Sequence, residues 1–204
     1  SGQLGIGSTS GKETPTQSNI TNVKELYVHN NSVLALKNDG TLWGWGANND
    51  GKFGFGRSSN IVTPTQLNIN NIKKVCLNSS NLIILKNDGT VWSCGSNYNG
   101  ELGIDSGVTI IMNFTKVNIT DVVDIDFNGS YAIAVKSDGT VWGWGVNNSG
   151  QLGDGTKTNK RAPVYISSGA EQVKLNAGNY LLIKNNIIKS SLELKNSTTR
   201  NRIK

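Results

Sequence analysis

The chain has 204 residues, enough for a domain with a sizeable core, and it is rich in glycine (24) and asparagine (28) but poor in proline (3). Because Gly and Asn tolerate positive φ, this composition favours short strands joined by many turns and argues against a helical protein. The net charge of +6 suggests a nucleic-acid partner, but residues 184–204 carry +5 of it and residues 1–183 only +1, so nucleic-acid binding is expected only through this basic tail.

A segment of about 50 residues repeats along the chain. The sequence KNDGTLWGWG at 37–46 returns in closely similar form at 86–95 and 136–145, and an Asn-x-x-Gly-x-x-Gly element follows each copy. The chain opens on the end of the same element, SGQLG. A fourth copy begins at Gln172 and departs from the pattern after Lys184, where Asn186 and Ile187 replace the Asp-Gly pair.

Each copy predicts strands in the same order. A short strand near Thr65–Leu67 and one such as Glu25–Val28 precede two alternating runs around an Asp-Gly turn, which predict a hairpin. Four short strands in about 50 residues are typical of a β-propeller blade. We therefore predict an all-β propeller of about three and a half four-stranded blades, partial or open. Its repeat units are about 1–46, 47–95, 96–145 and 146–186, the last incomplete, and a basic, degenerate C-terminal tail occupies 187–204.

The repeated string D-G-T-V-W-G-W-G-x-N-x-x-G-Q-L-G resembles the regulator of chromosome condensation repeat. The resemblance covers residues 1–186, and it implies a seven-bladed propeller of which this chain would be about half. The Asn-, Lys- and Ile-rich composition suggests a bacterial chain. Because bacterial members of the family resemble adhesion, secretion or interaction modules, the resemblance favours a secreted or cell-surface location over the cytoplasm. The residues that match structural positions of the repeat are Asp39, Gly40, Trp43, Trp45, Gly46, Asp88, Gly89, Trp92, Gly95, Asp138, Gly139, Trp142, Trp144 and Gly145.

The conspicuous side chains of the repeat have structural interpretations. We interpret each Asp of the Asp-Gly pairs as a turn residue that bonds its own backbone. The tryptophans are expected to pack between blades, the alternative being a platform that stacks sugars or peptides. Cys94 replaces the second Trp of its copy, so a neighbouring side chain is expected to fill the space. Cys76 and Cys94 should be free and buried, because strands two apart in a sheet are too distant for an unstrained disulfide.

Catalytic, cofactor and metal sites are not predicted. The chain has a single His, His29, and no Cys-His pair or paired carboxylates outside the turns. Asp124 and Asp126 alternate with apolar residues and are interpreted as the solvated side of a strand. No apolar run is long enough for a membrane-spanning helix.

Function is expected at the end of the blades where the loops vary between copies, because variable loops on a rigid scaffold commonly carry recognition. The prediction is a non-enzymatic module that binds an unidentified protein partner there. The resemblance leaves two alternatives open, a guanine nucleotide exchange factor for a GTPase and an inhibitor of the β-lactamase-binding type. The candidate partner-binding residues are Asn48, Asn49, Tyr98, Asn99, Tyr131, Asn147 and Asn148.

Closure of the propeller is a separate question. Three and a half blades leave two blade faces without neighbours, and such faces favour association. The chain is expected to be a fragment or truncated reading frame, with pairing to a second chain or an open arc as alternatives. Missing blades or a second chain would then be needed for closure.

Overall fold

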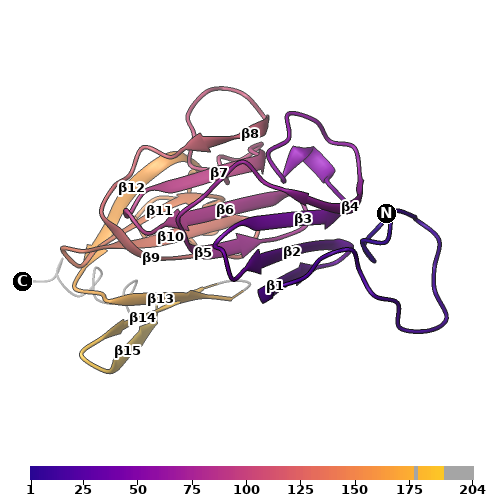
Figure 1. Cartoon of the computed structure of the whole chain (residues 1–204). Coiled ribbons are helices and arrows are strands. Elements are labelled where there is room, and N and C mark those ends of the chain that lie inside the picture. Colours follow the sequence, from indigo (N-terminus) through magenta and orange to yellow (C-terminus); the bar gives the residue numbers. More distant parts are fainter. Residues whose placement is uncertain (177–178, 191–204) are drawn as a thin grey trace, which may run out of the picture. The chain divides into compact units, whose positions relative to one another are not determined.

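The computed structural model describes residues 1–176 and 179–190, and antiparallel strands dominate it (Figure 1). Within these residues the only helical element is the single 3-10 turn η1 (Asn49–Gly51). No helix in this part of the chain is long and apolar enough to span a membrane. The predicted all-β class is confirmed.

The strands form four sheets, each with consecutive strands as neighbours. The first sheet contains β1 (Val23–His29), β2 (Ser32–Lys37), β3 (Leu42–Gly46) and β4 (Ile61–Gln66). The second contains β5 (Ile72–Leu77), β6 (Asn81–Lys86), β7 (Val91–Ser96) and β8 (Ile110–Lys116). The third contains β9 (Val122–Phe127), β10 (Tyr131–Lys136), β11 (Thr140–Gly145) and β12 (Lys160–Ser168). The fourth contains β13 (Gln172–Leu175), β14 (Tyr180–Lys184) and β15 (Ile187–Ser190).

Contacts divide the chain into two compact units. The first unit comprises residues 1–87, 92–96 and 110–115, and the second comprises residues 88–91, 97–109 and the chain from 116 onward. The core of the first unit includes Leu34, Phe53, Leu67, Leu82 and Ile84. The core of the second unit includes Tyr131, Ile133, Val141, Leu152 and Val173.

The sheets begin one strand later than the predicted repeat units. The sequence predicts the strand near Thr65–Leu67 as the first strand of the unit 47–95. In the structure this strand is β4, and it pairs with β3 of the preceding copy, with Gly44 opposite Thr65. The crossover between these two strands folds back on itself, since Asn48 Nδ2 donates to the carbonyl oxygen of Arg57 at 2.8 Å. The chain therefore returns to the sheet it has just left.

The Asp-Gly hairpin turns form as predicted. Asp39 Oδ1 accepts hydrogen bonds from the Thr41 backbone N–H (3.0 Å) and hydroxyl (2.6 Å). Asp88 and Asp138 accept the equivalent pairs of hydrogen bonds. The glycine that follows has φ between +77° and +80° in all three turns, a region that side chains with a Cβ avoid. The hydrogen bonds from Thr41 also hold the pKa of Asp39 below its usual value.

The fourth sheet departs from the other three. Its hairpin turns on Asn185 and Asn186, whose φ values of +49° and +61° fit a two-residue type I′ turn in place of Asp-Gly. The predicted tail, 187–204, begins too early, because its first four residues form β15, Ile187–Ser190. The rest of the predicted tail, 191–204, lies outside the described residues, and so does the expectation of nucleic-acid binding through it.

Candidate partner-binding loops

The second Trp of the repeat fills the space beside the Gly-rich element that precedes its sheet. In the first unit Trp45 is 4% exposed, and its Nε1 donates to the carbonyl oxygen of Gln3 at 2.9 Å. In the second unit Trp144 is fully buried and donates to the carbonyl oxygen of Glu101 at 3.1 Å. Each acceptor belongs to the Gly-rich element that precedes the sheet. Both rings are therefore buried by the protein itself and are not exposed as a platform for sugars or peptides.

The sheet that lacks a second Trp fills the space in another way. Cys94 is buried, and its Sγ lies 2.9 Å from the carbonyl oxygen of Lys52, the position that corresponds to Gln3 and Glu101. The ring of Phe114 from β8 packs against Gly54, so closely that a Cβ on this glycine would lie 2.6 Å from it. A neighbouring side chain therefore fills the gap, as predicted. Cys76 and Cys94 are both free and buried, also as predicted.

The first Trp of each copy is only partly buried, but its ring is covered from within the protein. The ammonium groups of Lys37, Lys86 and Lys136 lie 5.3, 5.6 and 5.8 Å from the ring centroids of Trp43, Trp92 and Trp142. A cation at this distance is attracted to the aromatic face. The repeated Lys–Trp pair thus gives these rings an internal partner.

The first Asn of each crossover is a structural residue. Asn48 and Asn147 are fully buried, as is Asn97. Asn147 Oδ1 accepts the Leu152 N–H at 3.0 Å, and its Nδ2 donates to Asp154 Oδ1 at 3.0 Å. Asn48 bonds its own crossover in the same way. The prediction that Asn48 and Asn147 contact a partner is wrong, because their amides hold the loop backbone instead of facing solvent.

Tyr131 is also misplaced by the prediction. It was predicted to lie in a variable loop, but the loop after β9 ends at Ser130. Tyr131 begins β10 and has 1% of its surface exposed. It packs in the core of the second unit, where burial raises the pKa of its hydroxyl to about 12. Its side chain is therefore not available to a partner.

The remaining candidates lie at the surface. Asn49, Asn99 and Asn148 are exposed, and Tyr98 is 58% exposed. Asn49 lies in the first unit, in η1, and the other three lie in the second unit.

Two crossovers of the second unit are bound to each other next to Tyr98. Asn159 Nδ2 donates to Asn99 Oδ1 at 3.2 Å, and Asn159 Oδ1 accepts the Asn147 N–H at 2.8 Å. Arg161 Nη1 donates to the carbonyl oxygen of Tyr98 at 3.2 Å. Asn159 and Arg161 were missed by the sequence analysis. The repeated Asn60, twelve residues after Asn48 as Asn159 is after Asn147, was an available signal for the first of them.

In the first unit, two strand turns meet around Ser79. Its hydroxyl accepts a hydrogen bond from Asn30 Nδ2 at 2.7 Å and lies 3.4 Å from His29 Nδ1, while its carbonyl oxygen accepts one from Lys52 Nζ at 2.8 Å. The single histidine thus takes part in a link between the β1–β2 and β5–β6 turns. In the part of the chain that the structure describes, no cluster of three or more His, Cys, Asp or Glu side chains could hold a metal ion.

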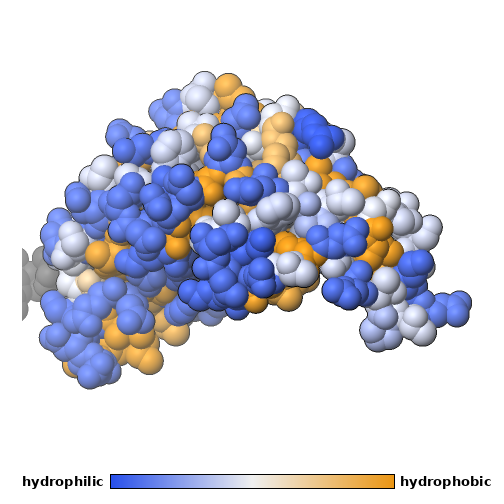
Figure 2. All heavy atoms as spheres, in the orientation of Figure 1, coloured by the Kyte–Doolittle hydropathy of each residue, from blue (hydrophilic) through white to orange (hydrophobic). Residues whose placement is uncertain are grey.

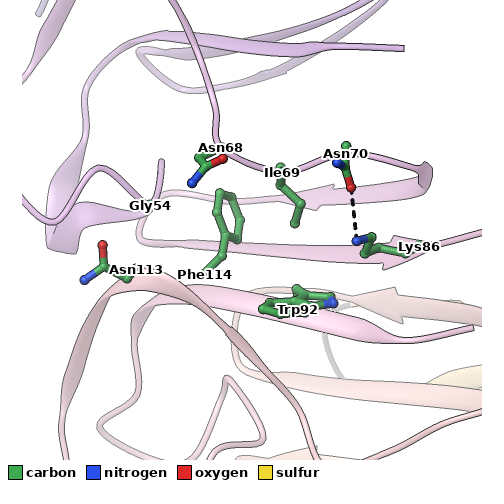
Figure 3. A pocket seen from close by; sticks show the side chains of 8 residues that line it. All are labelled: Gly54, Asn68, Ile69, Asn70, Lys86, Trp92, Asn113 and Phe114. Carbon is green, nitrogen blue, oxygen red and sulfur yellow. Dashed lines mark hydrogen bonds between the residues drawn. The ribbon is translucent and has the colours of Figure 1, made fainter. Parts of the chain in front are cut away.

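A pocket of about 340 Å³ opens in the first unit between the loop after β4 and strands β6, β7 and β8 (Figure 3). Its apolar lining is Ile69, Trp92 and Phe114. Lys86 Nζ donates to Asn70 Oδ1 at 3.2 Å across its mouth, which ties the loop to β6. The loop after β4 lies at the end of the sheets that carries the Asp-Gly turns, away from the crossovers.

The comparisons with known proteins agree with this architecture. The model of the regulator of chromosome condensation (RCC1) repeat matches residues 39–78 and 138–181, and a second model of the same description matches 72–101 and 122–151. Comparison with curated protein sequences gave no match.

Solved structures show the fold. Prp20p from Saccharomyces cerevisiae, described with its binding properties to Gsp1p and histones, is 18% identical with a TM-score of 0.71, over 98% of this chain and 53% of its own. Yeast RCC1 (Prp20) with Kap60 bound is 19% identical to this chain with a TM-score of 0.71, and the match covers 98% of this chain and 51% of the yeast chain. Human WBSCR16 is 17% identical to this chain with a TM-score of 0.53, and the match covers 90% of this chain and 70% of WBSCR16. The predicted β-propeller fold is confirmed, and the chain spans about half the length of the two yeast chains.

Proposed function

Because this chain belongs to the regulator of chromosome condensation repeat family, we propose that it is a non-enzymatic module that binds a protein partner through the exposed side chains of its crossover loops. The observation that carries this proposal is that adjacent residues of each crossover have different roles. The first Asn is buried and holds the loop backbone, while the residue that follows it is exposed. Loops fixed in this way lose little conformational entropy when they bind.

Tyr98 is the best anchor for such a partner. It is a large, 58% exposed aromatic side chain, and the guanidinium of Arg161 holds its backbone in place. Asn99 beside it is held by Glu101, whose carboxylate accepts the Asn99 N–H at 2.8 Å. Exposed tyrosines on rigid loops are enriched among the residues that dominate protein interfaces. The chemistry fits a partner that offers an apolar notch rimmed by hydrogen-bonding groups.

The yeast proteins of similar fold support a protein as the partner class. Prp20p is described as binding Gsp1p and histones, and yeast RCC1 (Prp20) as bound to Kap60. Since these chains are under 20% identical to this one, their particular partners are not transferred.

The test compares two tyrosines of the second unit with similar exposure, Tyr98 (58%) and Tyr165 (53%). Partners captured by the immobilised chain would be quantified by mass spectrometry for the wild type, Tyr98→Ala and Tyr165→Ala. We expect a specific partner whose recovery falls about tenfold or more with Tyr98→Ala and stays near wild type with Tyr165→Ala. Partners that bind all three proteins equally would place the binding surface elsewhere.

The two alternatives from the sequence make different predictions. An exchange factor would accelerate release of a fluorescent guanine nucleotide from a GTPase, and an inhibitor would reduce hydrolysis of a chromogenic β-lactam. The proposal expects neither effect, and a clear acceleration or inhibition that Tyr98→Ala abolishes would replace it with the corresponding alternative.

A further inference from the structure

The pocket in the first unit combines aromatic rings with amide side chains (Figure 3). Trp92 and Phe114 line it and are only partly buried. Asn68, Asn70 and Asn113 line it as well and are exposed, in keeping with the largely hydrophilic molecular face in Figure 2. Its volume of about 340 Å³ is at the lower end of the range for small-molecule sites, about 300 to 1,000 Å³, so it fits a ligand of one or two rings.

The lining of this pocket departs from the repeat at three positions. The departures, each followed by the residues that the copies of the first and third sheets have there, are Asn70 (Thr21 and Thr120), Asn113 (Thr63 and Ala162) and Phe114 (Pro64 and Pro163). The other lining residues keep the same residue type in these copies; they are Gly54, Asn68, Ile69, Lys86 and Trp92. Since the first and third sheets form without the two asparagines, these amides are additions that the fold does not require.

Neighbouring segments hold the added side chains in place. The Gly56 N–H donates to the carbonyl oxygen of Met112 at 2.9 Å, which fixes the backbone next to Asn113. Asn70 Oδ1 accepts a hydrogen bond from Lys86 Nζ at 3.2 Å, as Figure 3 shows. A side-chain amide has two N–H donors besides its oxygen, so Asn70 can bind a ligand while it holds Lys86. Side chains positioned in this way lose little conformational entropy on binding.

A second pocket of about 300 Å³ adjoins the first. It lies between the same loop and the first sheet, and the two pockets share Ile69 and Asn70. Its lining includes further amides, those of Gln66, Asn71 and Asn87. Two adjoining pockets that share a side chain fit a chain of several small polar units better than a single unit.

The chemistry of the first pocket matches a neutral saccharide. A sugar ring has an apolar C–H face, which an aromatic ring can contact, and hydroxyl groups that both donate and accept hydrogen bonds, as amides do. An acidic ligand would bring a negative charge, and Lys86, the only cation among the residues that line this pocket, already donates to Asn70. An apolar ligand would bury the amides without partners, which is unfavourable.

We propose that this pocket binds one ring of a neutral oligosaccharide. The C–H face of the ring contacts Trp92 and Phe114, and its hydroxyl groups form hydrogen bonds with the amides of Asn70 and Asn113. The next sugar unit extends over Asn70 toward the second pocket. The site is independent of the proposed partner loops, because its lining includes none of the candidate partner-binding residues.

The first experiment identifies the ligand class. The whole chain, carrying a fluorescent label, is applied to a printed array of neutral and acidic oligosaccharides at high density, which strengthens weak binding. We expect it to bind one or more of the neutral oligosaccharides, and to bind chains of two or three rings better than the corresponding monosaccharides. Binding of no neutral saccharide, or of acidic ones alone, would overturn the proposal.

The second experiment locates the site with substitutions that the repeat already contains. The double variant Asn70→Thr, Asn113→Thr should raise the dissociation constant of the best neutral oligosaccharide about tenfold or more in calorimetric titration, because two amides that bind hydroxyl groups are lost. The matched control is Asn31→Ser, which gives another exposed asparagine of the first unit the residue of the other copies, Ser80 and Ser130. It should leave the dissociation constant unchanged. Equal affinity of the wild type and the double variant, or an equal loss in the control, would refute this site.

The third experiment does not depend on a substitution. In an NMR titration of the wild type with the same oligosaccharide, the indole N–H resonance of Trp92 should shift. The resonance of Trp43 should stay in place, because Trp43 has the same lysine partner but does not line the pocket. No shift at Trp92, or shifts of equal size at both rings, would contradict binding at this pocket.

Discussion

Lys52 is a buried cation that should lower the free energy of unfolding by a measurable amount. It is 0% exposed, its Nζ donates to the carbonyl oxygen of Ser79 at 2.8 Å, and it lies over the ring of Phe53. Burial lowers the pKa of this ammonium from 10.5 to about 8. Other copies of the repeat have Gln3 and Gln151 at this position, so Lys52→Gln is a substitution that the repeat already tolerates.

The lowered pKa determines the sign and range of the effect. Between about pH 8 and pH 10.5 the unfolded chain holds a proton on Lys52 that the folded chain has released. The free energy of unfolding therefore rises with pH across this window. Below pH 8 the cost of the buried charge is fully present, and above pH 10.5 it is absent. The difference between a pKa of 10.5 in the unfolded chain and about 8 in the folded chain corresponds to about 3 kcal/mol in the free energy of unfolding.

The assay is urea unfolding of wild type and Lys52→Gln at pH 7 and pH 10.5. Taking the difference between the two proteins removes the contributions of other lysines and of the tyrosines, which titrate in both. We expect the wild type to gain about 3 kcal/mol relative to Lys52→Gln between the two pH values. A difference that stays constant within the uncertainty of the extrapolation would show that Lys52 keeps its ordinary pKa and that our account of its burial is incorrect.

Two further predictions concern the second unit. Gly103→Ala should lower the free energy of unfolding by about 1–3 kcal/mol more than Gly107→Ala, because both glycines have positive φ but only at Gly103 would the new Cβ meet a Trp ring, at 2.9 Å. Equal losses in thermal or urea unfolding would contradict this. Asp124→Ala should speed amide hydrogen exchange at Val173, whose N–H the carboxylate accepts at 2.9 Å, and leave Leu175 unchanged. Equal acceleration at both amides, measured by NMR, would indicate general loosening of the strand.

Local interactions were the predictable part of the fold. The Asp39 turn is complete within three residues, and the copies at Asp88 and Asp138 repeat it, so residue type and spacing are sufficient to identify it. Residue type and spacing also identify the hairpins, because each of these turns joins two adjacent strands. The period of about 50 residues with four strands in each copy then indicated propeller blades, and the family resemblance added the expectation of a seven-bladed ring.

Residues whose role depends on a distant segment were not predictable in this way. Asn48 and Asn49 are adjacent and identical in type, yet the first is buried because the crossover folds around its amide, and the second is exposed. Asp124 and Asp126 looked like the solvated side of a strand. They instead accept the N–H groups of Val173 and Leu175, each at 2.9 Å, at the edge of another strand. The N–H groups at the outer edge of β13 need acceptors, and only the fold shows that Asp124 and Asp126 lie beside them.

Departures from the repeat are informative when they are considered in pairs. In the second sheet Cys94 replaces a Trp, and Phe114 stands where the outer strands of the first and third sheets have Pro64 and Pro163. Either change alone would be unfavourable, since one leaves a space beside Gly54 and the other adds a large ring to a small position. Together they exchange one aromatic ring for another between neighbouring strands.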